Sequence, residues 1–123
     1  MVKIFLDDVR IPSECIHYMH KRIGKENPIY LENWIIVRNY DEFITSIKNN
    51  KGNISYISFD HDLADIHYDP KTWKESFEYQ EKTGYDCAKW FKEFYEKNNL
   101  DFPRLYVHSM NPVGTERIVN LFK

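Results

Sequence analysis

The sequence predicts an α/β fold, a three-layer sandwich in which one parallel sheet lies between helices. Two observations predict it. Short runs rich in Ile, Val and aromatic residues alternate with amphipathic helical segments along the 123 residues, and such alternation implies parallel strands joined by crossovers. Three of the strand-like runs also end abruptly in acidic, histidine or serine residues. We expect one domain over residues 1–123, with four strands in the order 2-1-3-4 and insertions at about 12–33 and 64–82.

The first predicted strand covers residues 2–6, a compact apolar run that ends in Asp7 and Asp8. The alternative is a helix with Asp7 as its N-cap. Pro12 disfavours that alternative, because the residue before a proline is held in an extended conformation. The run is therefore interpreted as a buried strand that places two carboxylates at its end.

Within residues 12–33, Ser13 is predicted to cap a short helix that Gly24 and Pro28 would end. Three apolar residues at helical spacing would share one face of it: Ile16, Met19 and Ile23. A second strand is predicted over residues 34–38. Asn39 or Asp41 then caps a helix whose apolar face carries Phe43, Ile44 and Ile47.

The third strand, residues 54–59, is the centre of the predicted sheet and ends at Asp60, His61 and Asp62. Ligands of open α/β sheets bind outside the carboxyl ends of the strands. The alternative is a polar loop whose aspartates cap a helix. Residues 64–82 follow as a long polar and aromatic excursion, which is either a lid over the site or a partly helical flap that covers the core.

The clearest helix begins after Thr83. Its predicted buried stripe consists of Cys87, Trp90, Phe91, Phe94 and Tyr95. A last strand over residues 105–107 ends at His108 and Ser109, and Thr115 is predicted to cap the final helix.

Composition excludes several classes of protein. A net charge of −2 gives no basic field for duplex nucleic acid. The two widely spaced residues Cys15 and Cys87 fit neither a zinc motif nor a disulfide framework. No segment is apolar and long enough to span a membrane, and the early acidic residues do not fit a signal peptide, so we expect a cytoplasmic protein. The bias toward Lys, Asn, Ile and Tyr suits an AT-rich genome, such as many phages carry.

The carboxyl ends of parallel strands share one edge of a sheet, so the three polar strand ends should meet there. The residues concerned are Asp7, Asp8, Asp60, His61, Asp62, His108 and Ser109. Crowded carboxylates repel each other, and a divalent cation, protonation or the nearby basic residues Arg10, His61 and His108 must compensate.

Two chemistries fit such a site. Asp7, Asp8 and Asp60 are hard oxygen ligands that suit Mg²⁺ or Mn²⁺. His61 and His108 suit acid–base work on a phosphodiester, with Asp62 or a neighbouring carboxylate orienting one imidazole. Beyond His108, the helix that opens at Gly114 and Thr115 offers N–H groups to an anion. All of these features indicate a phosphate group.

Four sequence blocks carry a resemblance to a known family. They are Leu6–Pro12, Ser58–Leu63, Thr83–Asp86 and Val107–Gly114. Together they resemble the cyclic-phosphate-processing receiver-like domains, relatives of response-regulator receivers found in bacteria and phages. The resemblance implies a flavodoxin-like fold and the processing of cyclic phosphates in nucleotides or RNA ends. It also matches Asp7, Asp8 and Asp60 to the acidic pocket of receivers, and Ser109 to their hydroxyl after the fourth strand.

One departure bears on function. No fifth strand with the receiver lysine follows the last helix, and a receiver without that lysine should be a poor phospho-switch. Our leading hypothesis is therefore hydrolysis of a cyclic phosphate ester in a nucleotide or RNA end. Asp60, Asp62, His61 and His108 would be catalytic in this hypothesis. Five residues would bind the substrate: Arg10, Ser109, Asn111, Gly114 and Thr115. The alternative is a degenerate receiver that binds a cyclic nucleotide or a protein partner without catalysis, for example as a phage counter-defence factor.

Overall fold

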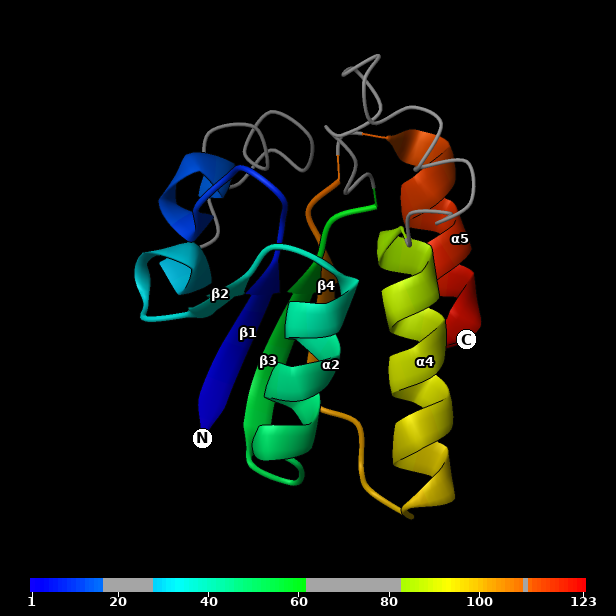
Figure 1. The fold of residues 1–123 in the computed structure, drawn as a ribbon. Helices are drawn as coiled ribbons and strands as arrows, with labels where there is room; N and C mark the ends of the chain where they lie inside the picture. The colour runs from blue at the N-terminus through cyan, green and yellow to red at the C-terminus, as the bar shows by residue number, and fades with distance from the viewer. Residues whose placement is uncertain (17–27, 62–82, 110) are drawn as a thin grey trace, which may run out of the picture.

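The computed structural model describes residues 1–16, 28–61, 83–109 and 111–123. Four parallel strands form one sheet in the order β2-β1-β3-β4, which confirms the predicted order (Figure 1). The strands are β1 (Val2–Leu6), β2 (Ile35–Val37), β3 (Ile54–Phe59) and β4 (Arg104–Val107). Within the described residues no fifth strand follows β4.

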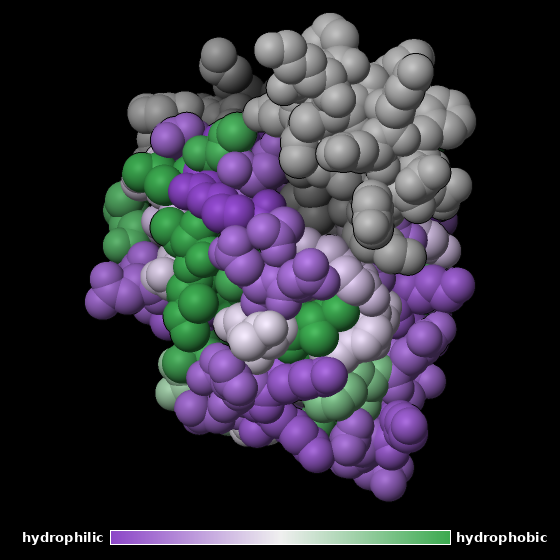
Figure 2. All heavy atoms as spheres, in the orientation of Figure 1, coloured by the Kyte–Doolittle hydropathy of each residue, from purple (hydrophilic) through white to green (hydrophobic). Residues whose placement is uncertain are grey.

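The three described α-helices pack against one face of the sheet. They are α2 (Tyr40–Asn49), α4 (Gly84–Lys97) and α5 (Pro112–Leu121), and α4 contacts both of the others. Their apolar residues form the main core with the side chains of Ile4, Leu6, Ile57 and Phe59. The outward surface of α4 is mostly hydrophilic, as expected of an amphipathic helix (Figure 2). No described helix is long and apolar enough to cross a membrane.

The opposite face of the sheet carries a smaller core around Phe5. It is covered by two 3-10 turns, η1 (Pro12–Glu14) and η2 (Pro28–Leu31), which bring Cys15, Ile16 and Tyr30 against that ring. Ser13 lies inside η1, whose own cap position is Ile11, followed by Pro12 with the fixed φ of a first helical residue. The helix that Ser13 is predicted to cap extends beyond the described residues, so that capping role stays a prediction. Met19, Ile23 and residues 64–82 lie outside the described residues.

The helix N-termini follow local capping chemistry. Asn39 caps α2 by accepting the Glu42 N–H at 2.9 Å, and Thr83 caps α4 in a capping box with Asp86. The prediction that Thr115 caps the last helix is wrong, because α5 begins at Pro112 and its cap is Asn111. The side chain of Asn111 accepts the Gly114 N–H at 3.0 Å.

Strand register places three rows of side chains on the sheet face opposite the α-helices, because alternate residues of a strand point to the same side. The first row consists of Lys3, Tyr56 and Arg104. The second consists of Phe5, Ser58 and Tyr106. Two positions further along the same strands come Asp7, Asp60 and His108, and the backbone ladder continues there through Asp60 N–H to Leu6 O and His108 N–H to Phe59 O. Pleat and register together bring three chain-distant polar residues to one place.

Candidate functional site

Asp7, Asp60 and His108 form a buried cluster at the carboxyl edge of the sheet. One ligand-type atom from each residue lies within 4.8 Å of those of the other two. All three side chains are at most 1% exposed. The expectation that the polar ends of β1, β3 and β4 converge is met by these residues. Asp8 is half-buried beside them, and Asp62 lies outside the described residues.

Asp7 is the most heavily hydrogen-bonded member of the cluster. Its Oδ1 accepts the backbone N–H groups of Val9 and Arg10, at 3.0 and 2.9 Å. Its Oδ2 lies 3.0 Å from Nε of Arg10 and 3.1 Å from Nε2 of His108. Burial alone would raise the pKa of Asp7, but the bonds from His108 and the two N–H groups outweigh it and hold that pKa well below its usual range. Asp7 is therefore a fixed anion that anchors its neighbours.

Arg10 lies between the two buried carboxylates. Its Nε bonds Asp7, and its Nη2 lies 3.6 Å from Oδ2 of Asp60. Arg38 holds the loop in place by donating to the carbonyl oxygens of Asp7 and Arg10, at 3.2 and 2.6 Å. A quarter of the Arg10 side chain is exposed, whereas both carboxylates are buried. Among Asp7, Arg10 and Asp60, only the Arg10 side chain is partly exposed to solvent.

The carboxyl group of Asp60 has a pKa near neutral pH. Burial and the negative charge of Asp7 raise its pKa to about 7, against the opposing effects of Arg10 and of the His61 N–H that Asp60 Oδ1 accepts at 2.9 Å. The half-buried Asp8 adds a smaller contribution in the same direction as Asp7. Two carboxyl groups in one cluster therefore have pKa values pushed far apart, a pattern that marks many acid–base sites.

His108 is fully buried and bonded at both ring nitrogens. Nε2 contacts Asp7, and Nδ1 lies 2.7 Å from the hydroxyl of Ser58, which in turn lies 2.8 Å from the hydroxyl of Tyr30. The ring stacks on Phe5 with 4.3 Å between centroids. Burial lowers the pKa of His108 although the carboxylate of Asp7 acts to raise it. The network fits a neutral imidazole that donates to Asp7 and accepts from Ser58.

The expectation that His108 and His61 act as an acid–base pair stays a prediction. In this structure the His108 side chain is fully buried and both of its ring nitrogens have partners, so its contacts orient Asp7. Sequence reasoning missed its partners Ser58 and Tyr30. The sequence did contain a signal for Ser58. It lies two residues before Asp60 in a buried strand, so the two side chains must point to the same side of the sheet. Nothing in the sequence pointed to Tyr30, which comes from η2.

His61 is held between the starts of α4 and α5. Its carbonyl accepts the Gly84 N–H at 2.7 Å, and its ring packs on Gly114 so closely that an added Cβ there would lie 2.3 Å from Cγ of the imidazole. The His61 side chain is largely buried, with 8% exposed. Its catalytic role stays a prediction, and the structure gives it a packing role as well.

The predicted substrate-binding residues beyond His108 build the start of α5. Asn111 donates its N–H to Oγ of Ser109 at 3.1 Å, and the Thr115 hydroxyl donates to the Ser109 carbonyl at 3.4 Å. The expectation that the N–H groups of Gly114 and Thr115 are open to an anion is wrong. They are bonded to the side chain and the carbonyl of Asn111, respectively, because the helix cap is Asn111, four residues before the predicted cap Thr115.

The fit of a divalent cation depends on Arg10. Asp7, Asp60 and His108 have the spacing to hold one, which differs from the predicted set by His108 in place of Asp8. The oxygens of Asp7, however, already accept four donors, and the guanidinium of Arg10 supplies the positive charge between the carboxylates. A divalent cation bound there would offer positive charge to a phosphate, as the guanidinium of Arg10 does. Binding of Mg²⁺ or Mn²⁺ stays a prediction, in competition with Arg10.

We expect Arg10→Gln to bind Mg²⁺ or Mn²⁺ more tightly than the wild type does. The variant removes the resident cation and leaves two buried carboxyl groups without their countercharge. Isothermal titration calorimetry with MnCl₂ measures the affinities of both proteins. Arg104→Gln, at the end of β4 that is far from the site, is the control for the loss of one positive charge. Equal affinities in wild type and Arg10→Gln would show that the guanidinium does not occupy the cation position.

The raised pKa of Asp60 predicts how stability depends on pH. The unfolded carboxyl loses its proton near pH 3.8 and the folded one near pH 7, so this group's contribution to stability falls as pH rises between those values and is constant above them. Asp60→Asn should therefore match the wild type in acid and be more stable by a few kcal/mol, about 4 at most, above neutrality. Urea unfolding at several pH values tests this, and a gap that does not change with pH would contradict it.

The four-stranded parallel sheet and this acidic edge define a receiver-like domain. The family comparison is more specific, since the cyclic-phosphate processing receiver domain matches residues 2–123. The chain therefore belongs to the family of cyclic-phosphate processing receiver domains. Comparisons with curated proteins and with solved structures give no significant match.

Proposed function

We propose that this domain hydrolyses a cyclic phosphate ester, in a nucleotide or at an RNA end, at the edge of the sheet where Arg10 lies between Asp7 and Asp60. The observation that carries the proposal is the partly exposed Arg10 side chain, whose guanidinium contacts both Asp7 and Asp60 while His108 contacts Asp7. A guanidinium suits the non-bridging oxygens of a phosphate because its N–H groups match them in pairs. A phosphodiester bound to Arg10 would then lie beside Asp60.

The proposed reaction needs one group that both accepts and returns a proton. The oxygen of a water molecule bonds to phosphorus, and one proton of that water passes to Asp60. The bond from phosphorus to one ring ester oxygen breaks, and Asp60 returns the proton to that oxygen, which leaves a phosphate monoester and a free hydroxyl. A carboxyl group whose pKa is about 7 suits both halves of this transfer near neutral pH. His61 and Asp62 are the second candidates for a proton-transfer role.

The roles of the surrounding residues follow from their contacts. Asp7 keeps its charge and orients Arg10. His108 contacts Asp7, and Ser58 contacts the other ring nitrogen of His108, so both residues help to fix Asp7. Ser109 and Asn111 shape the start of α5, against which His61 packs. In this scheme Arg10 and Asp60 contact the substrate, and the other residues position them.

A second candidate function is a binding module that holds a cyclic nucleotide without cleaving it. The burial of Asp60, of which 1% is exposed, favours this candidate, because a catalytic carboxyl group must reach its substrate. The receiver-like edge would then serve as a phosphate pocket built on Arg10.

A substrate panel separates the two candidates. The protein is incubated with 2′,3′-cyclic and 3′,5′-cyclic nucleotides and with RNA ending in a cyclic phosphate, with and without Mg²⁺, and the products are separated by chromatography. The proposed function predicts a phosphate monoester from at least one of them. Saturable binding with no product from any of them would support the binding module instead.

A further inference from the structure

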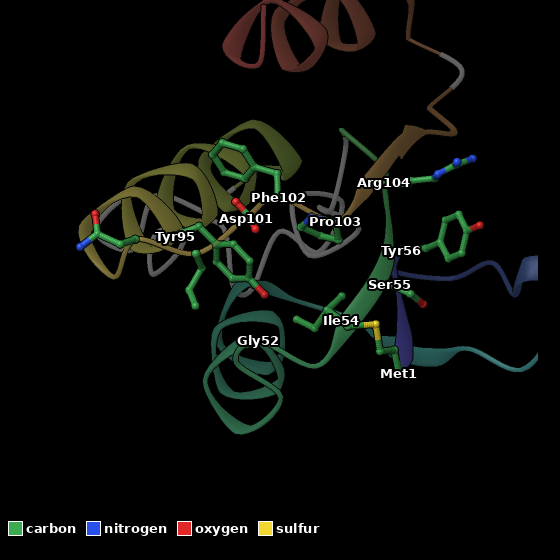
Figure 3. A pocket seen from close by; sticks show the side chains of 12 residues that line it. Met1, Gly52, Ile54, Ser55, Tyr56, Tyr95, Asp101, Phe102, Pro103 and Arg104 are labelled. Atoms are coloured by element: carbon green, nitrogen blue, oxygen red, sulfur yellow. The ribbon is translucent and has the colours of Figure 1, made fainter.

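The sheet face opposite the α-helices leaves part of β3 and β4 accessible. The three described α-helices pack on the other side, and η1 and η2 gather around Phe5. Tyr56 and Tyr106 are half-buried on this face, and Arg104 is exposed. Figure 3 shows Tyr56 and Arg104 projecting to the same side of the sheet and away from Tyr95 and Phe102. We call Lys3, Tyr56, Arg104 and Tyr106 the tyrosine face.

Aromatic rings and cations alternate on the tyrosine face. The rings of Tyr56 and Tyr106 are stacked, with 5.9 Å between centroids and 18° between planes. Nζ of Lys3 lies 5.8 Å from the centre of the Tyr56 ring, and Arg104 pairs with Tyr56 in the register of β3 and β4. Glu32 makes an acidic contact at this rim, with its carboxylate 3.3 Å from Nζ of Lys3. The face therefore joins stacked π surfaces to positive charge although the chain as a whole is acidic.

The tyrosine face is continuous with the candidate site. Alternate residues of a strand are about 6.6 Å apart, so Tyr106 lies one row from His108 and Arg104 lies two rows from it. Tyr106 also contacts Tyr30, the outer member of the hydrogen-bonded chain to Asp7.

We propose that the tyrosine face binds single-stranded RNA, whose bases stack on Tyr106 and Tyr56 and whose phosphates contact Arg104 and Lys3. Aromatic platforms flanked by cations bind single strands in this way, because every base has a π face and every nucleotide a charge. The choice of RNA as the single-stranded ligand rests on the proposed function. A terminal cyclic phosphate bridges the 2′ and 3′ oxygens of one ribose, so its carrier is RNA. The substrate is then a strand end rather than a free nucleotide.

Fluorescence anisotropy with a labelled single-stranded RNA that ends in a 3′ hydroxyl tests the proposal. This probe carries no cyclic phosphate, so its binding does not depend on turnover. We expect Tyr106→Leu to weaken binding by at least about fivefold and Tyr106→Phe, which keeps the ring, to bind like the wild type. Arg104→Gln should weaken binding and reduce the slope of log affinity against log salt by about 0.7. Lys89→Gln, an exposed charge on α4, is the matched control and should change neither.

Three results would overturn the inference. One is the absence of wild-type binding at about 100 μM protein in low salt, near the weak limit of non-specific binding. Another is equal binding by Tyr106→Leu and the wild type. The third is self-association in sedimentation experiments that Tyr106→Leu abolishes, which would make the face an interface between two copies. If the protein binds RNA but cleaves no cyclic phosphate, the inference about the tyrosine face is supported and the proposed function is refuted.

Discussion

Replacing Gly84 with alanine should destabilise the fold by about 3 kcal/mol or more. A Cβ at this position would lie 1.5 Å from the carbonyl oxygen of Asp60 and 2.9 Å from Cα of His61. Both are backbone atoms, which cannot move aside as the end of a side chain can. The start of α4 would have to separate from β3, and the bond from the Gly84 N–H to the His61 carbonyl would break. Urea unfolding measures the loss.

Gly52→Ala is the matched control for this prediction. Gly52 has open space around it, but its φ of +76° is strained for alanine, so we expect a loss of only about 1 kcal/mol. Gly114→Ala gives an intermediate case, because its added Cβ would meet the His61 ring rather than backbone. His61→Ala should relieve much of that loss in the double variant. Equal stability of Gly84→Ala and Gly52→Ala would show that α4 and β3 are not packed as described.

Asp60→Asn should lower turnover of the preferred cyclic phosphate by about a hundredfold or more. Asparagine has nearly the same shape, and its carbonyl can still accept the His61 N–H, but it cannot take up and return a proton. Substrate affinity should be kept or increased, because the variant removes a negative group next to Arg10. Steady-state kinetics should thus show a loss in kcat without a matching rise in KM.

The control for Asp60→Asn is Asp101→Asn, which makes the same chemical change at an exposed position before β4. It should keep full turnover. Arg10→Gln should act mainly on KM, since the guanidinium is proposed to bind the phosphate in the ground state as well as in the transition state. Full activity of Asp60→Asn would exclude Asp60 from the proton transfer and would direct attention to His61.

The arrangement of strands could be predicted because it depends on local pattern. The apolar runs that end in Asp7, Asp60 and His108 mark the carboxyl edge of the sheet whatever the details of packing. The period-two alternation of a strand would also have placed Tyr56, Ser58 and Asp60 on one side of β3, but this inference was not drawn from the sequence. The α5 cap was mispredicted although a signal existed, since an Asn followed by Pro is typical of a cap and a first helical residue.

The electrostatic organisation of the site could not be predicted, because it depends on tertiary contacts. The sequence places Arg10 close to Asp7 but does not say that Arg38 fixes the loop or that the guanidinium reaches Asp60. Likewise, the full burial of His108 depends on Phe5 and on Tyr30 from η2. The contacts that bury His108 therefore could not be read from the polar end of its strand, and its catalytic role stays a prediction.

Phosphorus NMR of the wild-type protein with RNA ending in a 2′,3′-cyclic phosphate tests the central claim most directly. Cyclic and monoester phosphates give separate resonances, so binding and cleavage are distinguished in one sample. We predict that the cyclic resonance is replaced by that of a monoester with the wild type, and that it persists on the same timescale with Asp60→Asn. A cyclic resonance that broadens with the wild type but is never converted, on this RNA or on the best ligand of the panel, would contradict the proposed hydrolysis.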